Sequence, residues 1–359
     1  MRKNNKALLQ TPQGTESFCM EEAALHRQIC NRLSDILMLW GYLPVQTPIF
    51  DFYDIYSDYV KSEDVYRLTD REGDLLLLRN DMTLFLAKQI SVMLEEKNLP
   101  LRVFYSDTIL RHENRVDISK NEFFQTGAEI FGVEGEKGDL EILLLVEELL
   151  SVLPIKTFLH LGSRKLFNLC FQELRPEPKM HLSTAVADRN FELFDRLLEP
   201  YYTAEQRERF RQLFAFIGTP DEFGQFAETL PSQPLRDEAF YIAGLGKKTS
   251  GLFPDAAVRI DTSEIGERNY YTGMVFRVYA EYAATEIAGG GRYDTLMEHF
   301  GKTCPSVGFS LMQRKIESLP GLRREAVTPQ PRTLSGDDPA DLYLRAKPLR
   351  EKGEIVKLC

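Results

Sequence analysis

Side chains that can bind a small charged molecule occur in several short segments of this sequence. They are Asp81 and Thr83 after LLLLRN, Gln125 and Glu129 in EFFQTGAEIFG, Tyr270 and Tyr271 in NYYTG, and Tyr293 in GGRYD. In a closed pocket each of these groups needs a partner, because a buried donor or acceptor left unpaired costs about 1–3 kcal/mol. Taken singly, a threonine, a glutamine or a tyrosine can equally end a hydrogen-bond ladder in a sheet. Only the combination of these segments therefore indicates a binding pocket.

Metal, disulfide and nucleotide-loop chemistry have little support in the sequence. The five cysteines form no CxxC pair and are odd in number, which argues against a zinc site and against a disulfide framework. The run Gly289–Gly291 lies between a predicted strand and a predicted helix, but it lacks the GxGxxG spacing and the downstream acid of a dinucleotide loop. We therefore expect no metal and no cofactor.

Strands and helices must position these polar groups. Apolar residues at helical spacing predict a first helix that ends at Gly41. The predicted elements after it are an extended stretch over 43–56, a hairpin over 64–81, a strand pair over 101–133 and a helix over 139–153 that Pro154 closes. Residues from about 163 to 243 have helical spacing and proline breaks, and they are predicted to form a helical insertion.

The last third of the chain returns to strands. AAVRIDTS and NYYTGMVFRVYAEY alternate and are rich in β-branched and aromatic residues, whereas SVGFSLMQRKIESL has helical spacing. The tail from Pro320 is predicted to be a loop, followed by a short strand–helix–strand in DLYLRAKPLREKGEIVKLC. Strand runs with helices at both ends favour the α+β class, with an antiparallel sheet flanked by helices.

The composition is that of a globular chain with an acidic surface. Hydrophobic residues make up 43% and charged residues 27%, and 44 basic against 54 acidic residues give a net charge of −10. An acidic surface repels a polyanion, so a nucleic acid is not favoured as a partner. The N-terminus lacks the apolar core of a signal peptide, and no stretch approaches the roughly 18 apolar residues of a membrane span. We expect a cytoplasmic protein with no membrane contact.

The order of short segments in this chain resembles that of histidyl-tRNA synthetases. These segments, from about residue 11 to residue 319, are TPQGT, TPIFD, LLLRNDMT, LRHEN with EFFQTGAEIFG, YYTGMVF, GGRYD and PSVGFSL. The resemblance implies the class II aminoacyl-tRNA synthetase fold, an antiparallel sheet that holds ATP and an amino acid. It also implies a homodimer formed largely by the first helix and TPIFD. The apolar face of that helix, with Leu25, Ile29, Leu33 and Trp40, fits this role, although it can also pack within its own subunit.

The same resemblance implies a histidine-binding pocket. Asp81, Thr83 and Gln125 match the positions that hold the ammonium group in the family, and Asp81 is one methylene shorter than the usual glutamate. Glu129 and Tyr271 match the positions that bracket the imidazole ring. The remaining candidates, Tyr270 and Tyr293, fall beside them. Every acceptor that histidine needs is thus present.

The family's adenylation residues are only partly retained. Arg111 and Glu113 match the pair that holds the α-phosphate and the adenine of ATP. The arginine expected four residues before the tyrosine pair, which would contact carboxylate and phosphate together, is Gly266, and the arginine expected against the adenine is Lys315. A lysine cannot reproduce the planar guanidinium fork, and the loss of one fixed donor typically costs about 10²–10³-fold in rate.

Two neighbouring arginines offer alternative sources of positive charge. Arg314 precedes Lys315 directly, but on a helix this shift would turn the side chain by about 100°. Arg268 lies two residues after Gly266. We expect neither to restore adenylation, so the sequence predicts a histidine pocket without amino-acid activation.

The chain also lacks room for the family's anticodon-binding domain of roughly a hundred residues. We expect residues 1–320 to form the synthetase-like core and the short tail 321–359 to stand in place of that domain, so tRNA is not expected to bind. A core of this kind is similar to the regulatory subunits of the short-form, hetero-oligomeric ATP phosphoribosyltransferases. That resemblance implies a non-catalytic role in the first step of histidine biosynthesis, beside a short catalytic subunit, with histidine as the effector.

Two other functions remain open at this point. A synthetase fragment or paralogue that activates an amino acid would show ATP–pyrophosphate exchange, against which Gly266 and Lys315 argue. A histidine-sensing or tRNA-sensing module of a signalling protein would be accompanied by kinase glycine-loop and catalytic-loop segments, which the sequence does not contain.

Overall fold

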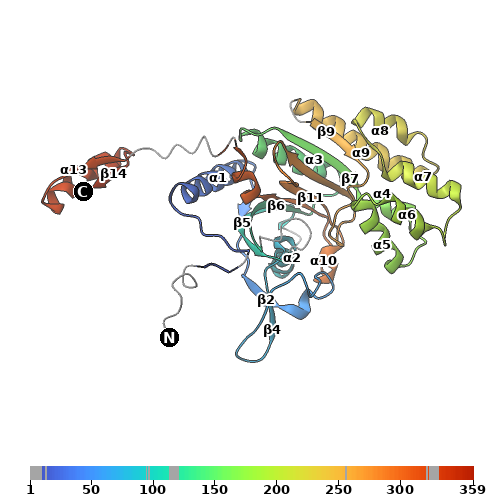
Figure 1. Cartoon of the computed structure of the whole chain (residues 1–359), viewed down its shortest axis with the longest axis horizontal. Helices are drawn as coiled ribbons and strands as arrows, with labels where there is room; N and C mark the ends of the chain where they lie inside the picture. The colour runs from blue at the N-terminus through green and yellow to red at the C-terminus, as the bar shows by residue number, and fades with distance from the viewer. Residues whose placement is uncertain are drawn as a thin grey trace.

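A large, mostly antiparallel sheet runs through the main body of the protein, in agreement with the α+β prediction (Figure 1). The computed structural model describes residues 10–12, 14–93, 95, 98–112, 121–254, 257–320, 322 and 331–359. The nine strands of the sheet, in spatial order, are β1 (Leu43–Pro44), β5 (Leu101–Leu110), β6 (Glu122–Phe131), β12 (Ser306–Met312), β11 (Ala288–Arg292), β10 (Met274–Ala280), β7 (Thr157–Ser163), β9 (Ala257–Asp261) and β8 (Ile217–Gly218). The pairs β1·β5 and β7·β9 are parallel.

The two faces of the sheet carry separate apolar cores, because side chains alternate along each strand. Ala128 and Ile130 of β6 belong to one core, and Phe123 and Phe131 of the same strand belong to the other. Helices that pack on the first face include α1 (Met20–Leu39), α3 (Gly135–Ser151) and α9 (Gln233–Leu252). Helices α2 (Met82–Met93) and α10 (Leu296–His299) pack on the second face. The candidate pocket lies on the second face.

Helix α1 confirms the first predicted helix. It ends beside Gly41, whose φ of +82° is a left-handed conformation that suits glycine at a helix end. Its apolar face packs against the sheet of its own subunit, since Ile29 and Leu33 are only 4% and 0% exposed. These two side chains are therefore buried within their own subunit, and the part that α1 takes in a homodimer stays a prediction.

A small sheet projects from the main body near the start of α2 (Figure 1). Its strands, in the order β2-β4-β3, are β2 (Phe50–Phe52), β4 (Leu75–Leu78) and β3 (Arg67–Thr69), and β3 with β4 is the predicted hairpin. The extended stretch predicted to reach residue 56 instead ends in the 3-10 turn η2 (Tyr53–Ile55). This turn brings the Tyr56 ring into a stack on Phe85, 4.7 Å between centroids, and lets its hydroxyl donate to Asp51.

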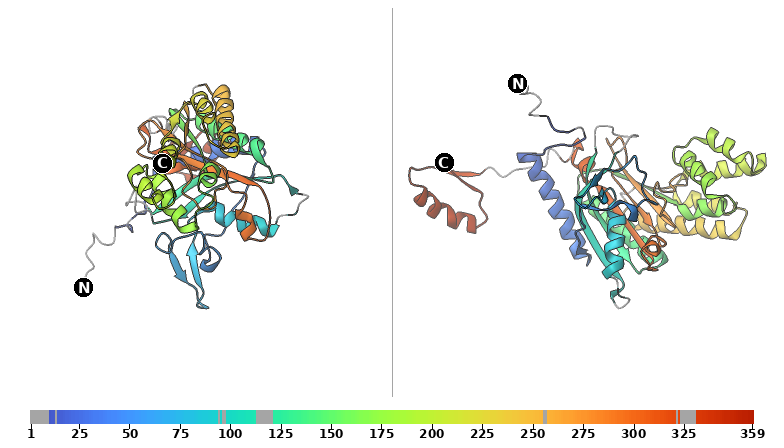
Figure 2. Two further views of the ribbon diagram at one scale, coloured as in Figure 1. Left: turned by 90° about the vertical axis from the view of Figure 1, so that its right-hand side faces the viewer. Right: turned by 90° about the horizontal axis from the view of Figure 1, so that it is seen from below.

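A group of short helices covers one end of the sheet (Figures 1 and 2). These helices are α4 (Arg164–Cys170), α5 (Pro176–Ala187), α6 (Phe191–Leu198), α7 (Ala204–Phe214) and α8 (Pro220–Ala227). Edge-to-face phenylalanine rings join them, such as Phe167 of α4 with Phe214 of α7 at 5.8 Å between centroids. Helix α9 continues to Leu252, so the helical run extends beyond the predicted limit at 243.

Two glycine-containing segments were predicted incorrectly. SVGFSLM is the central strand β12 and not part of a helix, and only Gln313–Glu317 that follow it form helix α11. The glycine run belongs to strand β11, between β10 and β12, and not to a loop before a helix. The cause is close packing in the sheet, since a Cβ at Gly290 would lie 2.3 Å from the carbonyl oxygen of Gly308.

The C-terminal residues form a small β–α–β unit apart from the main body (Figures 1 and 2). Its elements are β13 (Arg332–Leu334), α13 (Pro339–Glu351) and β14 (Val356–Leu358), and the two strands pair in parallel. The predicted strand in DLYL is wrong, because the Asp338 side chain caps a helix in which Leu342 and Ala346 face Val356. In the described part of the chain, no helix has both the length and the apolar character needed to cross a membrane.

Candidate functional site

A pocket of about 120 Å³ opens on the sheet face covered by α2. Six of the residues predicted from the sequence line it: Asp81, Thr83, Gln125, Tyr270, Tyr271 and Tyr293. The seventh, Glu129, lies directly behind this wall, where its two carboxylate oxygens accept hydrogen bonds from Thr83 at 2.8 Å and from Tyr293 at 2.5 Å. The volume is below the roughly 300–1,000 Å³ of sites for drug-sized ligands, so it suits a ligand of amino-acid size.

Side chains alternate between the two faces of strand β6, and this alternation places both Gln125 and Glu129 on the pocket side of the sheet. Gln125, Gly127 and Glu129 alternate with Thr126 and Ala128, which face the opposite core. Strand β12 pairs with β6 so that Gly308 lies opposite Glu129. A Cβ at position 308 would lie 1.5 Å from a carboxylate oxygen of Glu129, so only glycine leaves space for that carboxylate.

Asp81 is held in place at the start of α2. One of its carboxylate oxygens accepts from the backbone N–H of Leu84 at 3.2 Å, which caps the helix. The other accepts from the Tyr270 hydroxyl at 3.2 Å and faces the Nε of Arg268 at 3.3 Å. The acceptor predicted to hold an ammonium group is thus rigid and already paired with a cation.

Glu129 has the altered proton affinity expected of a buried carboxyl group. Burial raises its pKa to about 8, although hydrogen bonds from Tyr293 and Thr83 act to lower it, and the negative charge of Asp81 adds to the rise. At neutral pH the unliganded carboxyl group therefore largely keeps its proton. Such a group can share that proton with a ring nitrogen, and each of its oxygens has a second lone pair for a ligand N–H.

The four positions that match the family's nucleotide site differ in where the structure places them. Arg111 lines the same pocket, whereas Glu113 lies outside the described residues. Gly266 adopts a φ of +74°, and a Cβ there would lie 2.4 Å from the ring of Tyr271. The Lys315 ammonium group donates to Glu286, 3.2 Å from its carbonyl oxygen and 3.4 Å from its carboxylate.

Among the pocket residues that were not assigned to it from the sequence are Arg268, Arg277 and Glu264. Arg268 lines the pocket beside Asp81, and Arg277 lines it while paired with Glu264 at 3.2 Å. The proximity of Arg268 to the tyrosine pair was the only sequence signal, because its partner Asp81 is distant along the chain. Nothing in the local pattern marks the pairing of Arg277 with Glu264.

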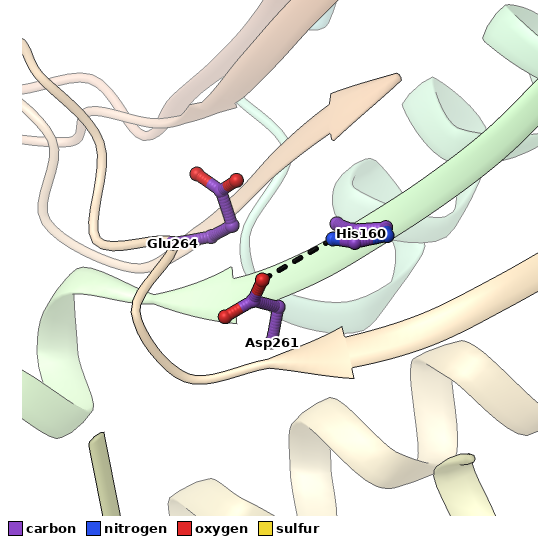
Figure 3. A group of neighbouring side chains, drawn as sticks. All are labelled: His160, Asp261 and Glu264. Carbon is purple, nitrogen blue, oxygen red and sulfur yellow. Dashed lines mark hydrogen bonds and ion pairs between the residues drawn. The ribbon is translucent and has the colours of Figure 1, made fainter. Parts of the chain in front are cut away.

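A second polar cluster lies beside the pocket, where His160 of β7 meets Asp261 and Glu264 at the end of β9 (Figure 3). The three groups are close enough to hold a cation. Asp261, however, is already bound to Arg189 at 2.5 Å and to the Ser263 hydroxyl at 2.7 Å. Since Glu264 is paired with Arg277, the arrangement is an ion-pair network rather than a set of open ligands.

Comparison with known proteins identifies the family. The family model described as histidyl-tRNA synthetase matches residues 14–316. Solved structures agree on the fold: an ATP phosphoribosyltransferase regulatory subunit/histidyl-tRNA synthetase from Bacillus halodurans has a TM-score of 0.84 at 21% identity, over 98% of this chain and 92% of that one. A histidyl-tRNA synthetase from Nostoc has a TM-score of 0.79 at 20% identity, over 98% and 86%. The protein therefore has the class II synthetase-like fold predicted from its sequence.

Curated relatives narrow this class. The ATP phosphoribosyltransferase regulatory subunit of Moorella thermoacetica is 33% identical, over 98% of this chain and 92% of the relative. The protein of the same name from Carboxydothermus hydrogenoformans is 29% identical, over 89% and 98%. The chain belongs to the family of ATP phosphoribosyltransferase regulatory subunits, as its sequence predicted. The name of these relatives implies a non-catalytic role.

Proposed function

We propose that this chain is the histidine-responsive subunit of a hetero-oligomeric ATP phosphoribosyltransferase. In this role it assembles with a short catalytic subunit, which joins ATP to phosphoribosyl pyrophosphate at the start of histidine biosynthesis in the cytoplasm. The observation that carries the proposal is the convergence of Asp81, Thr83, Gln125 and the three tyrosines on one small pocket backed by Glu129. The relatives' name supports the pairing with a catalytic partner.

Histidine fits the charges and the hydrogen-bonding groups of this pocket. Its ammonium group would meet Asp81, with Thr83 and Gln125 beside it. Its imidazole ring would lie between Tyr271 and Glu129, where a carboxyl group that keeps its proton near neutral pH can pair with a ring nitrogen. The ammonium and imidazole groups of the ligand would then each have a partner, as burial requires.

We also propose that amino-acid activation has been lost. Support comes from position 266, where the positive φ and the Tyr271 ring leave no space for the side chain that the family's chemistry uses. The Lys315 ammonium group is engaged by Glu286, and lysine lacks the planar fork of arginine. Arg111 is then a vestige of the nucleotide site.

The domain limits are part of the same proposal. Residues 1–320 would form the synthetase-like core, and residues 321–359 would occupy the place of an anticodon-binding domain. The C-terminal unit has a small core of four buried side chains, Leu334, Leu342, Ala346 and Val356. Its small size and the net charge of −10 both disfavour a tRNA-binding surface.

The chain is expected to form a homodimer through α1 and the small sheet, which contains the end of the TPIFD segment. Apolar side chains at Ile49, Phe50, Phe52 and Leu75 are 41–49% exposed there, and an exposed apolar patch of this kind usually marks an interface. Sedimentation at micromolar concentration should give a dimer, and the double change Phe50→Glu with Phe52→Glu should shift it toward monomer. A wild-type monomer at that concentration contradicts the dimer.

Assembly is tested by phosphoribosyl transfer. The short catalytic subunit should turn over slowly alone and faster when this chain is added, and the two should elute together in size-exclusion chromatography. Separate elution together with unchanged turnover would refute the proposed partnership.

A further inference from the structure

The pocket contains one cation whose position matches a part of the ligand not yet accounted for. An amino acid brings a carboxylate into the site as well as an ammonium group, and a buried carboxylate needs a positive partner. Of the other basic residues that line the pocket, Arg277 is paired with Glu264 at 3.2 Å and with Glu267 at 2.9 Å, and Arg111 lies over the Phe123 ring at 5.5 Å from its centroid. Arg277 is thus already neutralised by carboxylates that do not bind the ligand in the proposed arrangement, and Arg111 matches the family's position for the α-phosphate of ATP rather than for the amino acid.

Arg268 has a different kind of partner. Its Nε lies 3.3 Å from Asp81, the group proposed to bind the ammonium of histidine. Its side chain is 32% exposed and lines the pocket, and its two terminal nitrogens have no hydrogen-bond partner among the described residues. A guanidinium in this state presents a pair of parallel N–H donors, the geometry that binds a carboxylate with two hydrogen bonds.

Position 266 explains why the charge comes from residue 268. The loop between β9 and β10 passes Gly266 with a φ of +74°, and the Tyr271 ring occupies the space in which a side chain at 266 would begin. Two residues further along the same loop, Arg268 reaches the pocket without displacing that ring. The pocket thus keeps both the Tyr271 ring and a cation, which Arg268 supplies.

We propose that Arg268 binds the α-carboxylate of the amino acid while Asp81 binds its ammonium group, so that the pocket selects a zwitterionic ligand. This inference rests on the proposed histidine pocket. In the unliganded site, Arg268 and Asp81 neutralise each other. A zwitterion adds one charge of each sign to this pair, so binding leaves neither charge buried without a partner.

The test compares L-histidine with L-histidinol, which keeps the ammonium and imidazole groups but carries a hydroxymethyl group in place of the carboxylate. By calorimetry the wild-type chain should bind histidine about 10- to 100-fold more tightly than histidinol, the range expected for hydrogen bonds to charged groups. Arg268→Met should lose this factor for histidine without weakening histidinol binding, because histidinol has no carboxylate and Asp81, which also loses its cation, still attracts the ammonium group.

Two further variants make the test decisive. Arg268→Gln keeps a polar side chain without the charge and should give the same loss of selectivity, which covers the case in which the methionine variant is unstable. Lys315→Met removes a cation already bound by Glu286 and should leave the selectivity unchanged. Equal weakening of both ligands by Arg268→Met, or a wild-type chain that does not distinguish them, overturns the role of Arg268. A wild-type chain that binds no histidine overturns the proposed pocket itself.

Discussion

Replacement of Glu129 by alanine is expected to weaken L-histidine binding roughly 10- to 100-fold, about 1.5–3 kcal/mol. Glu129 is 1% exposed and faces the ring-binding end of the pocket through Thr83 and Tyr293. Its removal leaves an imidazole nitrogen and two hydroxyl groups without their partner in a closed site. Calorimetric titration of the variant with histidine measures the loss directly.

A matched control is available on the opposite face of the sheet. Glu147 of α3 is also a buried carboxyl group, with a pKa raised by burial to about 7, but it belongs to the helix that packs against the other core. Glu147→Gln should leave histidine affinity unchanged. If Glu129→Ala also left it unchanged, the pocket would be misassigned.

The pH dependence of histidine affinity is a second measurement of the role of Glu129. We expect the complex to hold one proton between Glu129 and the imidazole. Free Glu129 has a pKa of about 8, and a free imidazole has one of about 6.5. Above pH 8 a proton must be taken up on binding, and below about 6.5 one must be released, so affinity should be highest between these values and fall toward tenfold per unit outside them.

Glu129→Gln distinguishes this cause from titration of the ligand alone. The variant has no carboxyl group at position 129, so the fall in affinity that Glu129 causes above pH 8 should disappear, while the fall below 6.5, which belongs to the imidazole, should remain. Superimposable profiles for the two proteins would show that Glu129 does not share a proton with the ligand.

Histidine-dependent ATP–pyrophosphate exchange should be undetectable, at least about four orders of magnitude below that of an active synthetase. Both of the arginines that the family uses are missing, and one such fixed donor is typically worth about 10²–10³-fold in rate. Gly266 and Lys315 occupy the two positions. Exchange at the rate of an ordinary synthetase would contradict the proposed loss and favour the synthetase paralogue.

Restoring the two arginines should not restore exchange. Gly266→Arg forces a side chain into a backbone with φ of +74° and against the Tyr271 ring, 2.4 Å from its Cβ. This substitution should therefore also weaken histidine binding. Lys315→Arg alone should not weaken it, because Lys315 is not among the residues that line the pocket and its ammonium group is bound by Glu286. Recovery of exchange by the double variant would show that the loss lies in these two residues alone.

The residues that line the pocket could be placed together from the sequence where a local pattern positions each of them. The alternation of β6 directs Gln125 and Glu129 to one face, and the family order of segments brings α2 and the tyrosine pair to the same place. The prediction from the sequence failed where tertiary packing determines the secondary structure of a segment. The segment SVGFSLM has helical spacing, yet it is a central strand in which Gly308 leaves space for Glu129.

Side-chain pairings between distant segments could not be predicted either. The contact of Arg268 with Asp81 joins the loop before β10 to the start of α2, and no local signal marks it. The apolar face of α1 was predicted to lie at a dimer interface, and in the structure Ile29 and Leu33 of that face pack against the sheet of their own subunit. A periodic pattern shows that a face is buried but not what buries it.

In the proposed function, histidine bound in this pocket regulates a catalytic partner. The most direct test is phosphoribosyl transfer by the assembled enzyme, titrated with L-histidine, with either the wild-type chain or the Glu129→Ala variant. Both assemblies should turn over equally without histidine, since Glu129 takes no part in the partner's chemistry. The variant should need about 10- to 100-fold more histidine for the same inhibition. Equal inhibition of the two assemblies, with histidine binding to the isolated variant lost, would contradict the claim and place the regulatory site elsewhere.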